Sequence, residues 1–384
     1  MNTIGARRAV AAALGAVALV AASCGSGSSS KPGAPAQSEA TRDPAVRRLV
    51  DAARQEGKLS LIYFSGGSDT EMAALRKAFR SYYGLDLTID NTADPDQANV
   101  AARLGQEAQA GRRSSTDIYF GVGVFVENLK NQGVVKPGGL DGLPNLNGLV
   151  EDGVGVALRT DLPGITYNTA KVTGDKVPKV VGDVLREPSD VRVAATPYAS
   201  TLAALPWFVG AEQGITYNVQ LARKIKGLIL CGEESRIVSG EFDMLVTDCG
   251  EFAARRLKAQ GAPIAQVIPR DLAMESPSYL AIPDNAAHPN AARLWANFLL
   301  SRQAQDILWR YDLADNVHLN GSHQAKRVDE LRRQGLNFYD VRLADFVSHA
   351  NLNDAQDCIQ NVLNLRFDAP PCRAYQSVVK RAGG

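Results

Sequence analysis

Short runs of glycine, serine and threonine follow four apolar segments, and each run precedes a segment with helical spacing. The first backbone N–H groups of a helix lack intrahelical partners and carry a partial positive charge, so they can hold an oxyanion or a polar solute. Hydroxyl side chains in the same turns add neutral donors. The predicted ligand-binding residues are Ser65, Gly66, Gly67, Ser68, Gly121, Gly123, Tyr198, Ser200, Thr201, Thr247 and Asp248.

Each of these turns has a simpler explanation when it is taken alone, as a helix cap or a tight turn. Four such turns in a chain of alternating strands and helices favour a shared binding site. Ligands of open α/β sheets lie beyond the carboxyl ends of the strands, where turns of this kind occur. We therefore expect the four turns to line one cleft.

Other chemistry finds little support in the residue types and their spacing. No Gly-x-Ser-x-Gly or His-Glu-x-x-His motif occurs, so the commonest hydrolase signatures are absent. His318 and His323 are separated by a loop sequence rather than by a helical turn, which disfavours a metal pair. His288 belongs to a His-Pro turn, for which we expect a structural role. The sequence predicts no catalytic residue, no cofactor and no bound metal.

Four cysteines follow Cys24, and an even number in an exported chain indicates two disulfides. Three pairings are possible. The local pairing, Cys231 with Cys249 and Cys358 with Cys372, is favoured because each bond closes a short loop. A redox or metal role is the alternative, but none of these cysteines forms a Cys-x-x-Cys motif or stands beside a histidine.

The N-terminus has the composition of an export signal. Arg7 and Arg8 precede fourteen residues without a charge, 9–22, whereas a membrane-spanning helix needs about 20 apolar residues. Small residues before Cys24 make residues 1–23 resemble a bacterial lipoprotein signal, in which the cysteine is lipidated and becomes the first mature residue. The alternative is an ordinary secretory signal followed by an incidental cysteine. One acyl chain anchors only marginally, so stable attachment to the cell membrane implies more than one.

The rest of the composition indicates a soluble, exported body on a tether. Residues 24–42 are rich in Gly, Ser, Pro and Ala, which predicts a flexible tether. Beyond residue 23 the chain has 40 basic and 41 acidic residues, a balance without the electrostatic footprint that nucleic acid requires. About 340 residues exceed one ordinary core, so two lobes are expected. No later segment reaches membrane-spanning length.

Strand and helix patterns alternate along the mature chain. Residues 43–57 show helical spacing up to a glycine, 58–65 form an apolar strand pattern, and a helix is expected to start at Ser68 or Asp69. The alternation continues through 85–135 and predicts α/β lobes with mainly parallel sheets covered on both faces. The pentapeptide GITYN occurs twice, at 164–168 in a strand pattern and at 214–218 in a helical one, so the repeat is accidental.

The segment AIPDNAAHPNAARLWANFLLSRQAQDIL, residues 281–308, resembles the late part of substrate-binding lipoproteins of ABC importers, in particular relatives of ferric-ion-binding proteins. AARQEGKLSLIYFS, ITYNTAKV, VSGEFDMLV and LKAQGAPI agree with it, so the resemblance covers about residues 45–345. It implies the type 2 periplasmic binding protein fold, with two doubly wound lobes joined by two crossing strands. The expected division is residues 43–160 with 275–315 for lobe 1, and 161–274 with 316–384 for lobe 2.

The resemblance implies a monomeric, lipid-anchored receptor that closes around a small solute and delivers it to an ABC permease. Ferric-binding members carry two adjacent tyrosines after the Gly-Glu-x-Asp strand, but residues 247–252 here read TDCGEF. We expect Asp248 and Glu251 to be a helix cap and a solvated side chain. Fe(III) prefers phenolate and other anionic oxygens, so a small organic or oxyanionic solute is the better expectation. An exported lipoprotein enzyme and a surface sensor without transport are the alternatives.

Overall fold

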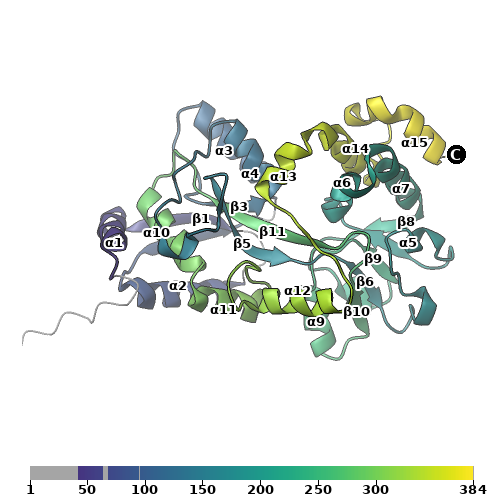
Figure 1. The fold of residues 1–384 in the computed structure, drawn as a ribbon, viewed down its shortest axis with the longest axis horizontal. Helices are drawn as coiled ribbons and strands as arrows, with labels where there is room; N and C mark the ends of the chain where they lie inside the picture. The colour runs from purple at the N-terminus through teal and green to yellow at the C-terminus, as the bar shows by residue number, and fades with distance from the viewer. Residues whose placement is uncertain (1–41, 64–67, 95, 384) are drawn as a thin grey trace, which may run out of the picture. The chain divides into compact units, whose positions relative to one another are not determined.

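The computed structural model describes residues 42–63, 68–94 and 96–383 of the 384-residue chain (Figure 1). The predicted signal, residues 24–41 of the predicted tether with Cys24, and the predicted site residues Ser65, Gly66 and Gly67 lie outside these ranges. None of the helices in the described ranges is long and apolar enough to cross a membrane. The strands form one two-stranded and two five-stranded sheets with helices packed around them, which is the α/β architecture expected from the sequence. The two-stranded sheet is joined to one of the others by an isolated bridge and is described together with it.

The first sheet gathers strands from the beginning of the chain and one long late strand. β1 and β2 are parallel, β3 pairs with β11, and β11 pairs in turn with β5, which pairs with β4. A bridge between Leu61 and Ile118 joins β1 to the segment that leads into β3. The strands are β1 (Lys58–Tyr63), β2 (Thr88–Ala93), β3 (Tyr119–Val122), β4 (Val150–Glu151), β5 (Gly155–Asp161), β11 (Met274–Ala281) and the short β12 (Tyr339–Asp340) beside β11.

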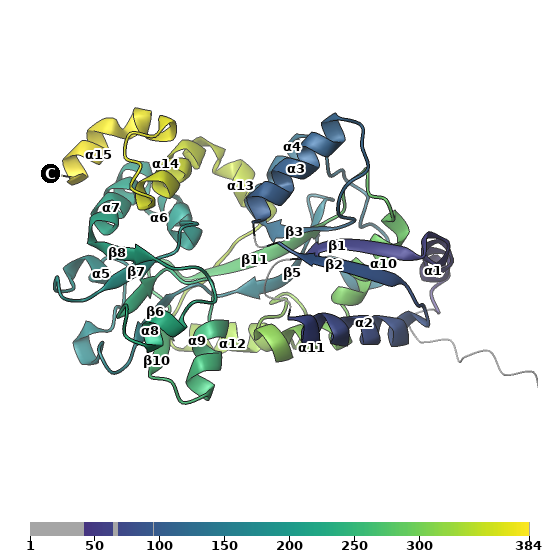
Figure 2. The same cartoon turned by 180° about the vertical axis from the view of Figure 1, so that it is seen from behind.

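Helices cover both faces of this sheet, and together they form what we call the first lobe. In both views α3 and α4 lie on one side of the strands, and α2 and α11 lie on the other (Figures 1 and 2). The helices of the first lobe are α1 (Pro44–Glu56), α2 (Asp69–Tyr83), α3 (Gln97–Gln109), α4 (Gly123–Asn131), α10 (Pro289–Leu299) and α11 (Arg302–Asp312), with a 3-10 turn at Pro144–Leu146.

The second sheet has the order β10-β6-β9-β7-β8, and with its helices it forms the second lobe. β7 is parallel to β8 and β9, whereas β6 is antiparallel to β9 and β10. Its elements are β6 (Ile165–Asn168), α5 (Asp183–Arg186), β7 (Val193–Ala195), α6 (Leu205–Val209), α7 (Ala211–Lys224), β8 (Ile225–Leu228), α8 (Ser235–Val238), β9 (Met244–Val246), α9 (Phe252–Ala259) and β10 (Ile264–Val267), with 3-10 turns at Gly174–Lys176 and Ser200–Ala204.

Both sheets are mixed, so the expectation of mainly parallel sheets is wrong in this respect. The chain passes from the first sheet to the second between β5 and β6, and it returns between β10 and β11. β5 and β11 run antiparallel to each other, as do β6 and β10, because one strand of each pair leaves its lobe where the other enters. The GITYN repeat is accidental, since its first copy lies in β6 and its second in α7.

Local signals explain where the first two helices begin and end. The Asp43 side chain accepts a hydrogen bond from the Ala45 N–H at 2.6 Å, and Ser68 Oγ accepts one from the Glu71 N–H at 3.1 Å. Both helices end at a glycine with positive φ, 67° at Gly57 and 61° at Gly84. A residue with a Cβ would be strained there, so glycine fixes both ends.

An aromatic cluster around Trp295 holds the helices of the first lobe together. The Phe79 ring lies 5.2 Å from the rings of Tyr83 and Trp295, centroid to centroid, and 5.6 Å from that of Phe298. The Tyr83 hydroxyl contacts the backbone carbonyl of Leu294 at 3.3 Å. The adjacent tyrosines at the end of α2 are therefore packing residues, since the Tyr82 ring also contacts those of Tyr83 and Phe298.

The last part of the chain is mostly helical, and both disulfides have the favoured local pairing. Cys231 and Cys249 are bonded with their Cα atoms 5.9 Å apart, and Cys358 and Cys372 with theirs 4.6 Å apart. The late elements are α12 (His323–Arg333), α13 (Leu343–Ser348), α14 (Asn353–Leu363) and α15 (Gln376–Gly383), with 3-10 turns at Ala350–Leu352 and Pro370–Tyr375.

Candidate functional site

Two of the predicted binding turns lie side by side in the second lobe. β7 and β9 are parallel neighbours, with Ala194 opposite Leu245, so both strands end at the same edge of the sheet. The turn after β7 leads into the 3-10 helix that Ser200 begins, and Thr201 in it is buried. The turn after β9 begins with Thr247, which is also buried and whose Oγ1 has no hydrogen-bond partner among the described residues.

Tyr198 is the most accessible side chain of these two turns, with 48% of its surface exposed. Partial burial raises the pKa of Tyr198, and the carboxylates of Glu233 and Asp96 raise it further. Asp96 is the N-cap of α3, where its side chain accepts a hydrogen bond from the Asn99 N–H at 3.0 Å. The phenol of the second lobe thus lies within electrostatic reach of the first turn of a first-lobe helix.

Asp248 holds the turn after β9 in place. The expectation that it caps a helix is therefore wrong. It is fully buried, and its carboxylate accepts hydrogen bonds from the Gly164 N–H at 2.8 Å, Thr166 Oγ1 at 2.6 Å, the Gly250 N–H at 3.0 Å and Gln266 Nε2 at 2.9 Å. Burial raises the pKa of Asp248 to about 6, although these donors act in the opposite direction. Direct contact with a solute stays a prediction for this residue.

Glu251 differs from the expectation of a solvated side chain. Its carboxylate is buried and accepts hydrogen bonds from Arg327 Nε at 3.1 Å and from Arg327 Nη2 at 2.6 Å. A paired, buried carboxylate of this kind ties α9 to α12. The sequence could not show this pairing because Glu251, which precedes α9, and Arg327, in α12, are far apart along the chain.

The predicted first-lobe residues that the structure describes, Ser68, Gly121 and Gly123, have capping or packing roles. Ser68 is exposed but uses its hydroxyl to cap α2. A Cβ at Gly121 would collide with the Tyr119 hydroxyl, and one at Gly123 would collide with the ring of Phe346. The glycines therefore permit close packing of two aromatic rings, while their contact with a solute remains a prediction.

A buried charge cluster, which the sequence did not reveal, lies where β5 leaves the first lobe. Arg159 Nη1 lies 2.6 Å from Asp312 Oδ2, and Arg159 Nε lies 3.5 Å from Asp161 Oδ2. Glu71, from the first turn of α2, is fully buried, and neither of its oxygens has a hydrogen-bond partner among the described residues. Burial raises the pKa of Glu71 to about 8, and the nearby Asp312 carboxylate adds to this effect.

The cluster adjoins the second lobe through Asp161. A Cβ on Gly250 would lie 3.2 Å from the Cβ of Asp161, and Gly250 has a φ of +125°. The turn after β9 and the start of α2 therefore flank the same buried region. Its members come from β5, α2 and α11, and no spacing in the sequence brings them together.

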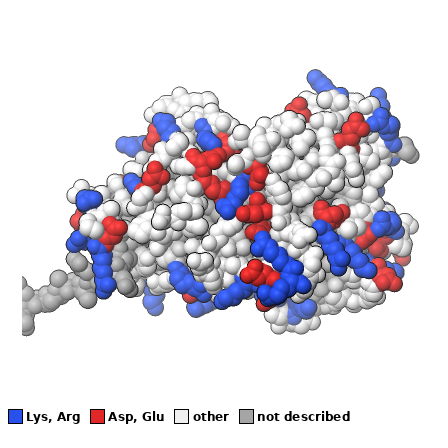
Figure 3. Space-filling view, viewed as in Figure 1, with Lys and Arg blue, Asp and Glu red and all other residues white. Residues whose placement is uncertain are grey.

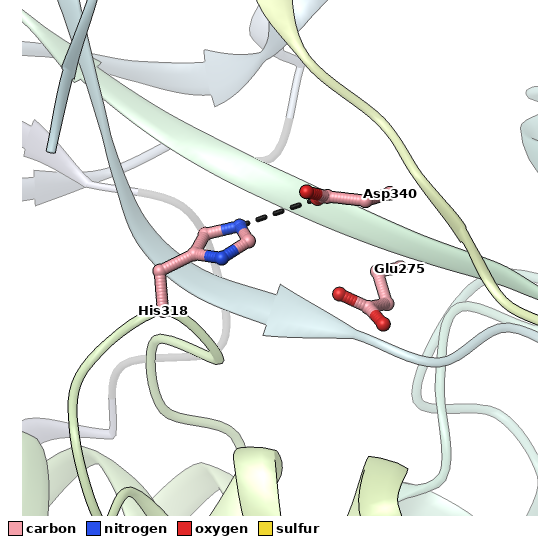
Figure 4. Close-up of side chains that lie close together, drawn as sticks. All are labelled: Glu275, His318 and Asp340. Carbon is pink, nitrogen blue, oxygen red and sulfur yellow. Dashed lines mark ion pairs between the residues drawn. The ribbon is translucent and has the colours of Figure 1, made fainter. Parts of the chain in front are cut away.

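Glu275, His318 and Asp340 lie close enough to one another to be considered as metal ligands (Figure 4). One donor atom from each lies within 4.8 Å of the others, and His318 Nε2 is 3.2 Å from Asp340 Oδ1. Arg332 donates to Glu275 at 2.6 Å, however, and Arg342 donates to Asp340 at 2.9 Å. Each carboxylate therefore has its own cationic partner, and a metal ion would compete with the arginines.

Charged side chains of both signs are interleaved over the middle of the face shown in Figure 3, and neither sign forms an extended patch there. Arg342 illustrates this mixing, since it pairs with Asp340 and with Glu151 Oε1, each at 2.9 Å. This face therefore offers local ion pairs rather than a broad electrostatic field.

The sequence matches the model of a family described as bacterial extracellular solute-binding protein, over residues 61–311, and the chain belongs to this family. Comparison with curated proteins finds no match. The family consists of binding proteins that work outside the cytoplasm, not of enzymes.

Solved structures show the same fold at low sequence identity. The substrate-binding protein of an ABC transporter from Agrobacterium tumefaciens is 16% identical, with a TM-score of 0.64 over 80% of this chain and 94% of that one. Iron-bound HitA from Pseudomonas aeruginosa is 16% identical, with a TM-score of 0.60 over 79% and 99%. AfuA from Actinobacillus pleuropneumoniae, with fructose-6-phosphate bound, is 20% identical, with a TM-score of 0.55 over 68% and 85%.

Proposed function

We propose that this protein is the lipid-anchored receptor of an ABC importer and that it captures a small solute between its two lobes. The membership of residues 61–311 in the solute-binding family carries this proposal. The adjacent ends of β7 and β9 support it, because they place two polar turns at one sheet edge, where ligands of α/β sheets bind. The solute favours the closed state by its differential affinity for the two arrangements of the lobes.

The surroundings of Tyr198 favour an uncharged or cationic organic solute over an oxyanion. Partial burial is the main cause that raises the pKa of Tyr198, and the carboxylates of Glu233 and Asp96 add to it because they disfavour a negative charge at its hydroxyl. An oxyanion at the same place meets the same repulsion. Ferric iron has still less support, since the turn after β9 has no tyrosine and its Cys249 is bonded to Cys231.

The proposed lobes are residues 43–160 with 275–315 and residues 161–274 with 316–384, each with its own hydrophobic core. Phe79, Trp295 and Phe298 belong to one cluster of buried side chains, whereas Ile215 and Met244 belong to another. Separate cores let two lobes move as bodies about the strands that join them.

The membrane attachment is tested at Cys24. Intact mass of the mature protein is expected to show a chain that starts at Cys24 and carries acyl groups, and Cys24→Ala is expected to release the protein from the membrane fraction. A mature chain that starts elsewhere, without acyl groups, would contradict the anchor and leave the solute-binding role intact.

A thermal-shift screen tests the binding role. The panel contains polyamines, thiamin, neutral sugars, sugar phosphates, sulfate, phosphonates and ferric citrate. A solute that is present at 100 times its dissociation constant adds about 2.7 kcal/mol to the free energy of unfolding. Binding of sulfate or phosphonates alone would contradict the preference for organic solutes, and turnover of any panel member would contradict a receptor role.

Variants of the turn after β7 test the location of the site by calorimetry with the solute that the screen identifies. Tyr198→Ala, and Ser200→Ala combined with Thr201→Ala, are each expected to weaken binding about tenfold or more, the loss of about 1.4 kcal/mol that one good hydrogen bond provides. Thr173→Ala, an exposed threonine elsewhere in the second lobe, is the control. Unaltered affinity in both test variants would show that the solute binds elsewhere.

A further inference from the structure

The chain continues beyond the part that matches the family, and its continuation crosses from one lobe to the other. The family match ends at residue 311, whereas β12 and α13 follow at Tyr339–Asp340 and Leu343–Ser348. We call residues 339–349 the strap. In Figures 1 and 2, α13 lies near α4 of the first lobe, and α14 and α15 continue over α7 of the second.

Hydrogen bonds and a buried side chain attach the strap to the first lobe. The carboxylate of Glu151 accepts the Leu343 N–H at 2.8 Å and Arg342 Nη1 at 2.9 Å. Leu343 is fully buried in one hydrophobic cluster with Val126 of α4. These contacts attach the strap to the first lobe, although the proposed division assigns residues 316–384 to the second lobe.

Aromatic rings attach the same strap to the second lobe. The ring of Trp207, in α6, contacts that of Phe346 edge to face, with centroids 5.3 Å apart, and stacks on His349 at 4.7 Å. The Tyr339 ring lies 5.4 Å from that of Phe208. Beyond the strap, Cys358 and Ile359 of α14 are buried in the same hydrophobic cluster as Ile215 of α7, so the far end of the strap is held to the second lobe as well.

Phe346 lies at the point where the two sets of contacts meet. Its ring occupies the space beside Gly123, at the end of β3, and also packs on Trp207, which follows the turn that carries Tyr198. Separation of the lobes must therefore break the contact of Phe346 with one side or the other.

We propose that the strap is a built-in latch that holds the two lobes together without a solute, with Phe346 as its key contact. This inference rests on the proposed function only in that it assumes lobes that open. Opening breaks the aromatic contacts of Phe346 and forms no others in their place. The latch therefore lowers the population of the open state, which accepts the solute.

Spin-label distances test the latch without any solute. Labels are attached at Lys77→Cys in α2 and Lys226→Cys in β8, both exposed positions in different lobes, in the mature chain with Cys24→Ala. Pulsed electron paramagnetic resonance is expected to give one narrow distance distribution for this parent. Phe346→Ala is expected to add a second, longer distance in roughly a tenth of the molecules or more.

Val347→Ala is the matched control, because Val347 is the next residue of the same helix and 57% of its surface is exposed. Gly123→Ala serves as a second variant, since its Cβ displaces the Phe346 ring while Phe346 itself is retained. Circular dichroism of each variant confirms folding. Unchanged distances in both Phe346→Ala and Gly123→Ala overturn the latch, as does an equal change in Val347→Ala.

The result is independent of the solute screen. Longer distances in the variants, with no solute found, support the latch and count against the receptor role. A solute that binds, with distances unaltered in both variants, supports the receptor role and removes the latch.

Discussion

Asp248 and Glu71 are both fully buried carboxylic acids, but their surroundings differ. Asp248 receives four protein donors, two from backbone amides and two from side chains, whereas Glu71 receives none from the described residues. Burial raises the pKa of both groups, to about 6 for Asp248 and about 8 for Glu71. Both side chains are fully buried, so the four donors account for the smaller rise in pKa at Asp248, while the nearby Asp312 carboxylate adds to the rise at Glu71.

The largest expected effect comes from Asp248→Ala. The substitution leaves four buried donors without an acceptor, so we expect the free energy of unfolding to fall by about 4 kcal/mol. Urea denaturation at pH 7 measures this loss. Asp190→Ala, at an exposed aspartate of the same lobe, is expected to stay within about 0.5 kcal/mol of the parent. Equal losses in the two variants would remove the structural role of Asp248.

Glu71→Gln is expected to act in the opposite direction. Between the ordinary pKa of 4.5 and the folded value of about 8, folded Glu71 keeps a proton that the unfolded chain has lost. Stability therefore falls as pH rises through this window and levels off above it. The glutamine has no charge to bury, so we expect it to stabilise the protein by about 2 kcal/mol at pH 8 and by little at pH 4.5.

Melting temperatures of the parent and Glu71→Gln between pH 4.5 and pH 9 measure this divergence. Asp69→Asn is the control, because Asp69 is an exposed acid in the same first turn of α2. Parallel curves for the parent and Glu71→Gln would show that Glu71 is ionised in the folded protein at all these pH values, and the contrast with Asp248 would disappear.

Thr166→Val is expected to give the smallest effect. It tests the contrast between Asp248 and Glu71 by removing a single donor from Asp248. It removes the 2.6 Å hydrogen bond to Asp248 and keeps the shape of the side chain. We expect a loss of about 1 kcal/mol in urea denaturation at pH 7. No loss at all would mean that the remaining donors satisfy Asp248 by themselves.

Local structure could be predicted from the sequence because its signals lie within a few residues. Asp43 with Gly57, and Ser68 with Gly84, mark both ends of two helices. Cysteines separated by 18 and 14 residues pair as the short loops suggested. The antiparallel strand pairs could not be predicted, because the alternation of strands and helices does not encode where the chain leaves one sheet for another.

The candidate site could be predicted only as a set of turns. The sequence placed polar residues after β7 and β9, but only the sheet order shows that these two strands are neighbours. Glu71, Arg159 and Asp312 are separated by 88 and 153 residues, and no periodicity relates them. The contact of Phe346 with Gly123 could not be predicted either, because it depends on how the late helices fold back onto the first lobe.

Because Cys231 and Cys249 are bonded, the structure of one turn of the proposed site depends on the redox state of the compartment in which the chain folds. Cys249 directly follows Asp248, so the cross-link holds the same backbone that the buried carboxylate organises. A chain that folds in a reducing compartment lacks this brace. Recombinant material for any binding measurement should therefore be secreted or oxidatively refolded, and its free thiols counted before the first titration.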